Sequence, residues 1–407
     1  MGNSMLEGPL RSISAAGCPV RVVAVRLRAI QPQDDTLRFA SGWGASEEEA
    51  TRGCLLEAAE RSSAQFFGTE PIRRAALAEL AAEAVPPPDI LLVGDDQYRQ
   101  RRRWNTKHRG LNEIPALWRA DRAIDWVAAA PGLSSREAWL PAGLCFLGHR
   151  RDRKAGLAPA NSSGVAAGDT LENAAVRAFL ELVERDAVAV WWYNRISRPR
   201  LFPERLDEGL VAAYAQWSRN RDRVLQLHDL THDLGIPVLA AVSHNRDGSA
   251  IALGFGTGTS TRQAARHAIG ELAQCEYNLA LITEHVASQG PQGLTAEAKA
   301  LLGWVQSARL DEHPHLIGGP ALEADRREVA LDLTKCHDLC RRHGLQFLAL
   351  DLTRPGIEVP VSRVVVPGLR PIWARLAPGR LYDVPVKLGW LSRPLAPEAL
   401  NPVPLIV

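Results

Sequence analysis

The sequence lacks the features that mark membrane, secreted and disordered proteins. No apolar run approaches the roughly 18 residues of a membrane-spanning helix, and the first ten residues show no signal-peptide pattern. Only six cysteines are present, none of them in a CxxC pair, so we expect free thiols and a cytoplasmic location. A net charge of +2 gives no overall reason to bind nucleic acid or an anionic membrane. The 46% hydrophobic content instead predicts a folded protein with a sizeable core.

Strand-like and helical segments follow one another in an irregular order. We expect strands at 21–30, 140–147, 236–244, 250–255, 345–352 and 361–366. We expect helices at 47–67, 170–193, 261–285 and 293–308, the first with a capping box formed by Ser46 and Glu49. This order favours an α+β fold over a regular βαβ alternation. No low-complexity linker follows the triple proline at 86–88, so we predict an N-terminal segment, 1–40, and one intertwined unit, 41–407.

Two short segments have a structural and a functional interpretation. The basic run at 97–110 is interpreted as a solvated loop, in preference to a docking surface for an acidic peptide or, less favoured still, for nucleic acid. The segment KCHDLCRRHG at 335–344 is expected to be an amphipathic helix that ends at Gly344. Its Cys336 and Cys340 share one face with His337 and His343 nearby, and a buried structural pair is favoured over a metal site.

The strongest chemical signal is a pair of oxygen-bearing side chains that recurs on three predicted helices. The string LExxER occurs at 56–61 and again at 180–185, and a related ELAQ occurs at 271–274. Residues three apart share a helix face, so each string presents two oxygen donors side by side. The pairs are Glu57 with Glu60, Glu181 with Glu184, and Glu271 with Gln274.

The surroundings of these pairs suggest a ligand. The second helix is apolar on most faces, with one polar stripe of Arg177, Glu181, Glu184 and Arg185. The third helix has a comparable stripe of His267, Glu271, Gln274 and Asn278. A helix that is mostly apolar is buried, and charges on it must be compensated by ions, partners or a ligand. Converging carboxylates suit Mg²⁺, and salt bridges between helices are an equally good explanation at this point.

A small-residue loop at 161–170 leads directly into the second helix. Its glycines allow backbone N–H groups to approach a ligand, and a helix N-terminus favours anions. Asp169 and Glu172 also fit a capping box, and no Gly-Lys-Ser/Thr follows that would make a Walker A loop. The glycines at 254–258 precede the third helix in a similar way.

Taken together, these motifs resemble the YcaO family. The segment NSSGVAAGDTLENAAVRAFLELVERDA is similar to the central signature of that family. SGWGASEEEATRGCLLEAAERSSA resembles its first motif, GFGTGTSTRQAARHAIGELAQ its third, and LALDLTRPGIEVPVSRVVVPGL its C-terminal strand pair. The resemblance implies a YcaO-like fold, with mixed or antiparallel sheets and long buried helices that converge on an ATP and Mg²⁺ site.

The resemblance also implies the chemistry and the residues. It implies ATP-dependent phosphorylation of a backbone amide oxygen in a ribosomally made precursor peptide, with Mg²⁺ ligands at Glu57, Glu60, Glu181, Glu184 and Glu271. It implies nucleotide contacts at Arg61, Ser162, Ala166, Asp169, Asn173, Arg185, His267 and Gln274. The family often has Asn, Glu and Arg where this chain has Asp169, Asn173 and His267, so the nucleotide contacts differ in detail.

The nucleophile belongs to the substrate, so several products are compatible with the sequence. Cyclodehydration of Cys, Ser or Thr to a thiazoline or oxazoline is expected first, with macroamidine formation and thioamidation as alternatives in the family. A carboxylate-phosphorylating ligase and an inactive peptide-binding scaffold are the alternatives outside this chemistry.

The ends of the sequence suggest how the enzyme works with other molecules. About forty residues precede the first motif, so we expect a stand-alone enzyme of the bottromycin type or one served by a separate partner protein. The ending PVPLIV at 402–407 partly matches a proline-rich family ending and is predicted to reach the site or its rim. Its alternative role is packing, against its own subunit or across a homodimer contact.

Overall fold

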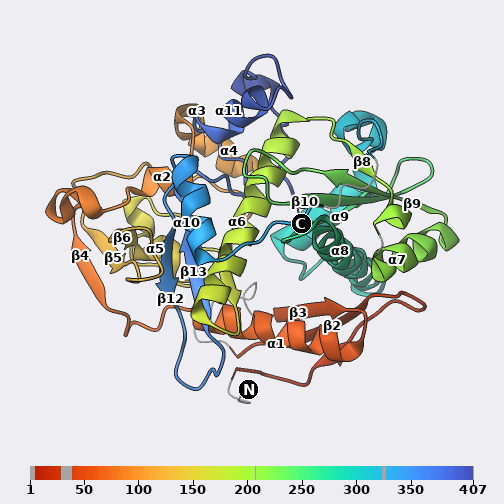
Figure 1. Cartoon of the computed structure of the whole chain (residues 1–407), viewed down its shortest axis with the longest axis horizontal. Helices are drawn as coiled ribbons and strands as arrows, with labels where there is room; N and C mark the ends of the chain where they lie inside the picture. The colour runs from red at the N-terminus through yellow and green to blue at the C-terminus, as the bar shows by residue number, and fades with distance from the viewer. Residues whose placement is uncertain (1–4, 29–38, 207, 323–326, 407) are drawn as a thin grey trace.

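The computed structural model describes residues 5–28, 39–206, 208–322 and 327–406, and within them the strands form four antiparallel sheets (Figure 1). One sheet has the order β1-β2-β3, with bounds Arg11–Ser12, Arg21–Arg26 and Phe39–Gly44. A second has the order β11-β10-β9-β8, with bounds Ala252–Thr257, Val238–Asn245, Arg223–Asp229 and Arg200–Leu201. The third is β12-β13-β7, with bounds Leu348–Asp351, Val361–Val365 and Val165–Ala167. The fourth is β4-β5-β6, with bounds Ile72–Ala75, Ile124–Ala128 and Trp139–Pro141.

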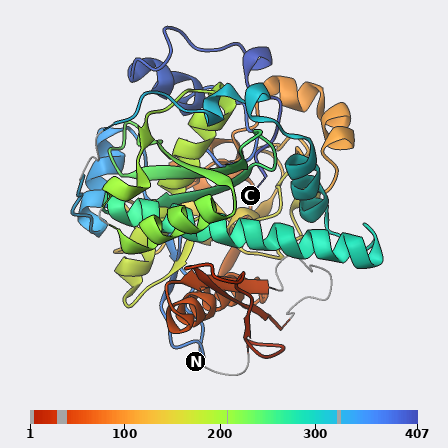
Figure 2. The ribbon, with the colours of Figure 1, turned by 90° about the vertical axis from the view of Figure 1, so that its right-hand side faces the viewer.

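Three long helices each follow a strand and pack against the sheet that contains it. They are α1 (Glu47–Ser63), α6 (Leu171–Asn194) and α8 (Thr261–Gln289), which follow β3, β7 and β11. Shorter helices surround them: α2 (Pro87–Leu91), α3 (Asp95–Arg99), α4 (Arg101–Lys107), α5 (Ala142–Cys145), α7 (Gly209–Asn220), α9 (Ala296–Ser307), α10 (Leu333–Arg342) and α11 (Arg380–Lys387). Figure 1 shows α6 in the middle of the molecule, and Figure 2 shows α8 running across above the β1–β3 sheet and α1. No helix in the described ranges is long and apolar enough to cross a membrane.

Glycine allows two of these helices to lie unusually close to their strands. A Cβ atom on Gly42 of β3 would lie 2.1 Å from the backbone nitrogen of Cys54 in α1. A Cβ atom on Gly254 of β11 would lie 2.2 Å from the backbone nitrogen of Leu272 in α8. The Gly-x-Gly strings before the first and third helices therefore serve close strand–helix packing.

A buried ion network holds the C-terminal part of the chain on α6. Asp186 is fully buried and accepts hydrogen bonds from Arg380 of α11 at 2.6 and 3.0 Å and from the backbone N–H of Arg370 at 2.8 Å. Arg380 also contacts Asp233 at 2.7 Å. Removal of Arg380 would deprive Asp186 and Asp233 of the guanidinium that they share, so this network fixes the position of α11 against α6.

Most predicted elements are confirmed, and three local predictions are wrong. The strand expected at 140–147 ends at Pro141, and α5 follows directly. The basic run at 97–110 contains the end of α3 and the whole of α4 rather than a loop. The cap of α6 is Thr170, whose side chain accepts the N–H of Asn173 at 3.1 Å, and not Asp169, because Asp169 lies one residue too early. Part of the first predicted strand, 29–30, lies outside the described residues.

The cap of α1 and the burial of the two cysteines on α10 follow the sequence closely. Ser46 caps α1 by accepting the N–H of Glu49 at 3.2 Å, while the Glu49 carboxylate accepts the N–H of Ala45, one residue before the expected partner. Cys336 and Cys340 are buried on α10, which confirms their expected burial on one face of this helix.

The end of the chain packs against the last turns of α6. The indole N–H of Trp192 donates to the carbonyl of Val403 at 2.8 Å, and Leu405 is buried in the same core cluster as Trp192. Trp192 is eight residues beyond Glu184, which corresponds to about 12 Å along a helix axis. These contacts favour the packing role of the tail; Val407 lies outside the described residues.

Candidate active site

The fold brings the five predicted glutamates together. Glu57 and Glu60 come from α1, Glu181 and Glu184 from α6, and Glu271 from α8. Electrostatic repulsion connects all five carboxylates, through the pairs Glu57–Glu60, Glu60–Glu181, Glu181–Glu184, Glu184–Glu271, Glu181–Glu271 and Glu57–Glu271. The predicted convergence of the three helices is therefore present in the structure.

Backbone amides of the neighbouring strands and loop orient these carboxylates. The N–H groups of Ser41, Gly164 and Phe255 donate to Glu57, Glu181 and Glu271 at 2.6, 3.1 and 3.3 Å. In each case the donor lies 16 or 17 residues before the acceptor, because the helix folds back on the segment that precedes it. The N–H of Ala167 in β7 donates to Glu60 of α1 at 2.8 Å and so joins two of the three units.

Two arginines neutralise only part of the negative charge. Arg61 contacts Glu57 at 2.6 Å and Arg185 contacts Glu181 at 2.7 Å, each one helical turn after its partner. The side chains of these two glutamates keep 26% of their exposure, so the cluster is open to solvent on this side. The carboxylates therefore remain accessible to a ligand.

The remaining three carboxyl groups have raised pKa values. Desolvation by the surrounding protein, together with repulsion from Glu57 and Glu181, raises the pKa of Glu60 to about 8 and the pKa of Glu271 to about 7. Burial, followed by repulsion from Glu271, also raises the pKa of Glu184. The cluster thus has more carboxylates than cationic partners from the protein. Carboxylate oxygens are the ligands that Mg²⁺ prefers, so the uncompensated groups fit this ion.

Most residues expected to contact the nucleotide surround this cluster. Arg61 and Arg185 contact glutamates directly, and Gln274 donates to the Ser41 hydroxyl at 3.0 Å. His267 pairs with the carbonyl of Thr257 at 2.7 Å, and the backbone of Thr257 in turn hydrogen-bonds to Glu184. Ser162 and Ala166 belong to the segment whose Gly164 and Ala167 amides bind glutamates.

Asp169 and Asn173 lie further from the carboxylates than the other predicted nucleotide residues. Both are exposed near the N-terminus of α6, and Asn173 comes two turns before Glu181. None of the contacts in the described part of the chain joins either side chain to the five glutamates.

Arg177 belongs to the polar stripe of the second helix, but sequence reasoning gave it no role in the site. Arg177 is exposed, although it lies in the buried part of α6, one turn before Glu181. It interacts electrostatically with Glu60 and His267, and in the described part of the chain its side chain has no ion-pair partner. The amide donors at Ser41 and Phe255 were also missed, because a backbone N–H leaves no mark in a sequence.

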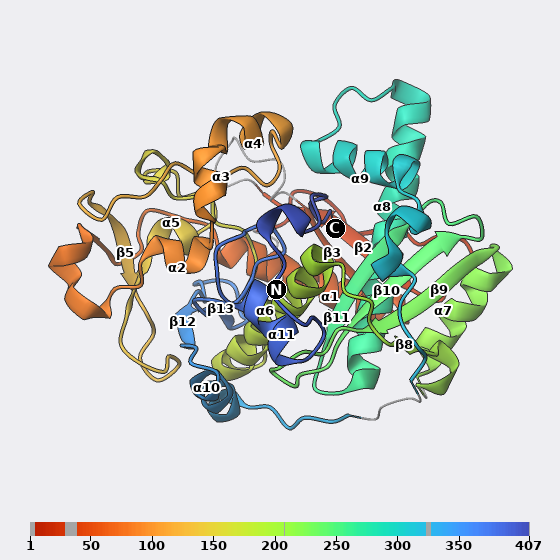
Figure 3. The same ribbon diagram turned by 90° about the horizontal axis from the view of Figure 1, so that it is seen from above.

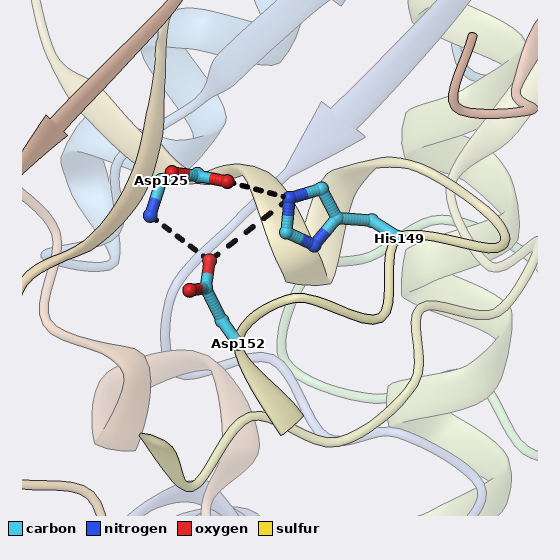
Figure 4. A group of neighbouring side chains, drawn as sticks. All are labelled: Asp125, His149 and Asp152. Atoms are coloured by element: carbon cyan, nitrogen blue, oxygen red, sulfur yellow. Dashed lines mark hydrogen bonds and ion pairs between the residues drawn. The ribbon is translucent and has the colours of Figure 1, made fainter. Parts of the chain in front are cut away.

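A second group of acidic and histidine side chains lies elsewhere, between β5 and the loop after α5. Figure 4 shows Asp125, His149 and Asp152 turned toward one another. Among the described residues, this is the one group of three such side chains whose potential ligand atoms all lie within 4.8 Å of one another. The guanidinium of Arg74 already contacts Asp125 at 2.8 Å and Asp152 at 3.1 Å, which makes this group a compensated ion network.

The chain belongs to the YcaO family, because the family model described as YcaO cyclodehydratase, ATP- and Mg²⁺-binding, matches residues 41–370. This match agrees with the fold and confirms ATP and Mg²⁺ as the expected cofactors. An uncharacterized protein of Methanothermobacter thermautotrophicus is 24% identical over 356 residues, which cover 84% of each chain.

Solved structures show the same fold. A heterocyclase in complex with substrate and cofactor is 33% identical with a TM-score of 0.85, over 98% of this chain and 54% of that one. The heterocyclase TruD is 34% identical with a TM-score of 0.73, over 89% of this chain and 51% of its own. The chain spans about half the length of these two heterocyclases. YcaO from Methanopyrus kandleri, bound with AMPPCP and Mg²⁺, is 20% identical with a TM-score of 0.60, over 89% of this chain and 85% of its own, and shows the fold alone.

Proposed function

We propose that this chain is a peptide cyclodehydratase that uses ATP to activate a backbone amide of a ribosomally made precursor peptide. The observation that carries the proposal is the meeting of five glutamates from three helices, with three of them lacking an arginine partner among the described contacts. The proposal that the product is a heterocycle is supported by the two heterocyclases, each about one third identical to this chain.

The five glutamates would hold magnesium, and the groups around them would hold the nucleotide. When bound, Mg²⁺ neutralises and positions the transferring phosphoryl group, which is most of what phosphoryl transfer requires. Arg185 and Gln274 would contact the nucleotide beside the 162–170 loop. Arg177 would add a cation near the transferring phosphate, because it points from the same face of α6 as Glu181 and has no carboxylate partner of its own among the described contacts.

The reaction requires an activated amide because an amide oxygen is a poor leaving group. A Cys, Ser or Thr side chain of the substrate adds to the carbonyl carbon, and the amide oxygen accepts the γ-phosphoryl group as the bond to ADP breaks. The addition closes the ring and releases the thiol or hydroxyl proton. The carbon–oxygen bond then breaks, phosphate leaves, and the amide nitrogen loses its proton as the carbon–nitrogen double bond of the azoline forms. The nucleophile comes from the peptide, so the role of the chain is to orient the groups and to stabilise charge.

Intact-mass analysis of the cognate precursor tests this proposal. Precursor incubated with the enzyme, ATP and Mg²⁺ should lose one water for each ring, and a thiol-labelling reagent should find one cysteine fewer per thiazoline. Water loss with all cysteines still free and the N-terminal amine blocked would indicate a macroamidine, and exchange of oxygen for sulfur would indicate a thioamide. An unchanged precursor mass with the complete enzyme system would contradict the proposal.

A further inference from the structure

The helix α4 and the turn that follows it present a row of cations that have no carboxylate partner. Arg102, Arg103, Lys107 and Arg109 are all exposed, and in the described part of the chain none of these side chains contacts an acid. We call these four residues the basic face of α4. Figures 2 and 3 place α4 at the outer edge of the molecule.

The opposite side of α4 is firmly attached to the protein. Arg101 donates to the carbonyls of Ile114 and Pro115, both at 2.9 Å, and the indole of Trp104 donates to Asn112 at 2.9 Å. Asn105 exchanges two hydrogen bonds with the backbone of Ile114 at 2.8 and 2.9 Å. The helix is therefore held in one orientation, and its outward cations are a fixed surface.

A hollow lies next to the basic face, so this surface has a concave shape in addition to its charge. It has a volume of about 750 Å³ and is lined by residues 98–103, which lie where α3 ends and α4 begins. Arg99 at its edge already pairs with Asp96, and Arg101 is held by backbone carbonyls. The exposed cations at the hollow that have no acid partner among the described contacts are therefore Arg102 and Arg103. A net charge of only +2 for the whole chain makes this a local excess that attracts an acidic ligand.

We propose that the basic face of α4 binds an acidic segment of the precursor peptide outside the residues that are modified. This inference rests on the proposed function: a backbone amide occurs at every residue, so selection of one peptide requires contacts away from the reacting atoms. An extended peptide of about 20 residues spans up to roughly 70 Å, which is enough to occupy the basic face and the carboxylate cluster together.

A peptide fits this surface better than a nucleic acid does. Trp104 is the aromatic residue of α4, and its ring packs inward against the core, so α4 itself offers no stacking platform for bases. Tyr98 is the single aromatic residue among those that line the hollow. The helix has seven residues and is about 10 Å long, which is short for tracking a phosphate backbone. Carboxylates on a flexible peptide can reach the separate guanidinium groups one by one.

Binding of a synthetic peptide tests the inference directly. The probe is a fluorescein-labelled Gly-Ser peptide of about 20 residues with regularly spaced Glu and Asp, compared with the same peptide carrying Gln and Asn. Fluorescence anisotropy should show tighter binding of the acidic probe, weakened by added salt. The R102E/R103E double variant should bind it about ten-fold more weakly, and R102Q/R103Q should fall between.

The double variant R341E/R342E is the matched control. It reverses two exposed neighbouring arginines on α10, on another side of the molecule, and should bind the probe as the unmodified protein does (Figure 3). Melting temperatures establish that each variant is folded. Equal binding of both probes, full binding by R102E/R103E, or preference for a duplex DNA probe would each overturn the inference. Because the test needs no turnover, its outcome is independent of activity: an inactive enzyme that still binds the acidic probe through α4 would contradict the proposed function and leave α4 as a binding surface for acidic peptides.

Discussion

At the scale of single residues, the five glutamates carry the same group but have different partners. Glu57 and Glu181 each have an arginine one turn later on their own helix, and a backbone N–H as well. Glu60, Glu184 and Glu271 have no ion pair among the described contacts, and their pKa values are raised. The demand for an added cation is therefore concentrated on the second glutamate of each LExxER string and on α8.

The thiol of Cys54 provides a test at this scale, since it is the cysteine one turn before Glu57. Burial raises its pKa to about 12, with the Glu57 charge as a smaller cause, and its sulfur contacts the carbonyl of Ala40 at 3.4 Å. A thiol with such a pKa is protonated and a poor nucleophile at neutral pH. Cys54→Ala should keep ATP-dependent conversion of the precursor within several-fold of the original. Complete loss of conversion in a folded Cys54→Ala protein would point to covalent catalysis.

At the scale of elements, the site is built from strand–helix units whose helices turn back on the preceding segment. The sequence predicted α1, α6 and α8 because a 3.6-residue periodicity is a local property, and it predicted their stripes for the same reason. It did not predict α3 and α4, because the apolar side of α4 is reduced to Trp104 among cations and polar side chains. The hydrogen bonds from Gly164 and Ala167 depend on how distant segments pack, which no local pattern records.

The close packing of β11 on α8 leads to a prediction for Gly254. A Cβ atom at this position would overlap the backbone of Leu272, one residue after Glu271, so Gly254→Ala should shift α8. We expect a loss of about 1–3 kcal/mol or more in the free energy of unfolding, measured by denaturant titration, together with weaker nucleotide binding.

Gly303 is the matched position, because it lies in helix α9 and a Cβ atom added there would have no described atom within 4 Å beyond its own helix backbone. Gly303→Ala should be neutral or stabilise the protein by up to about 1 kcal/mol, because alanine favours a helix. Equal stability of the two variants would show that β11 and α8 are packed less closely than the structure shows.

At the scale of the whole molecule, the family motifs are spread over the chain and meet only in three dimensions. The order of elements was enough to predict the α+β fold, whereas the convergent site was predicted from the polar stripes on three helices and from the resemblance to the family. The ion network of Asp125, His149 and Asp152 was not predicted, because Asp125 is far from the other two in sequence and no motif joins them. The buried cluster around α6 likewise includes His315, which no pattern marked as a core residue.

His315 makes the stability of the fold depend on pH. It is buried against Trp191 and Trp192, neither ring nitrogen has a hydrogen-bond partner among the described residues, and burial lowers its pKa to about 3. The unfolded chain, with a histidine pKa of about 6.5, binds this proton first as the pH falls. The free energy of unfolding should therefore decrease between about pH 6.5 and pH 3, by up to about 1.4 kcal/mol per pH unit from this residue.

Denaturant unfolding at about pH 7 and about pH 5 checks this expectation. His315→Leu should reduce the decrease between the two conditions, because leucine has a similar volume and does not titrate. A His315→Leu protein with the same pH dependence as the original would show that this histidine is not the source.

The central claim is that the three glutamate helices form one Mg²⁺–ATP site, and calorimetric titration with a non-hydrolysable ATP analogue tests it most directly. The unmodified protein should bind the analogue only when Mg²⁺ is present. Glu172→Gln, an exposed change in the first turn of α6, should bind it equally well. The double variant Glu181→Gln, Glu184→Gln should lose this binding while its melting temperature shows a folded protein. Mg²⁺-dependent binding of the analogue by the double variant, as tight as that of the unmodified protein, would contradict the account.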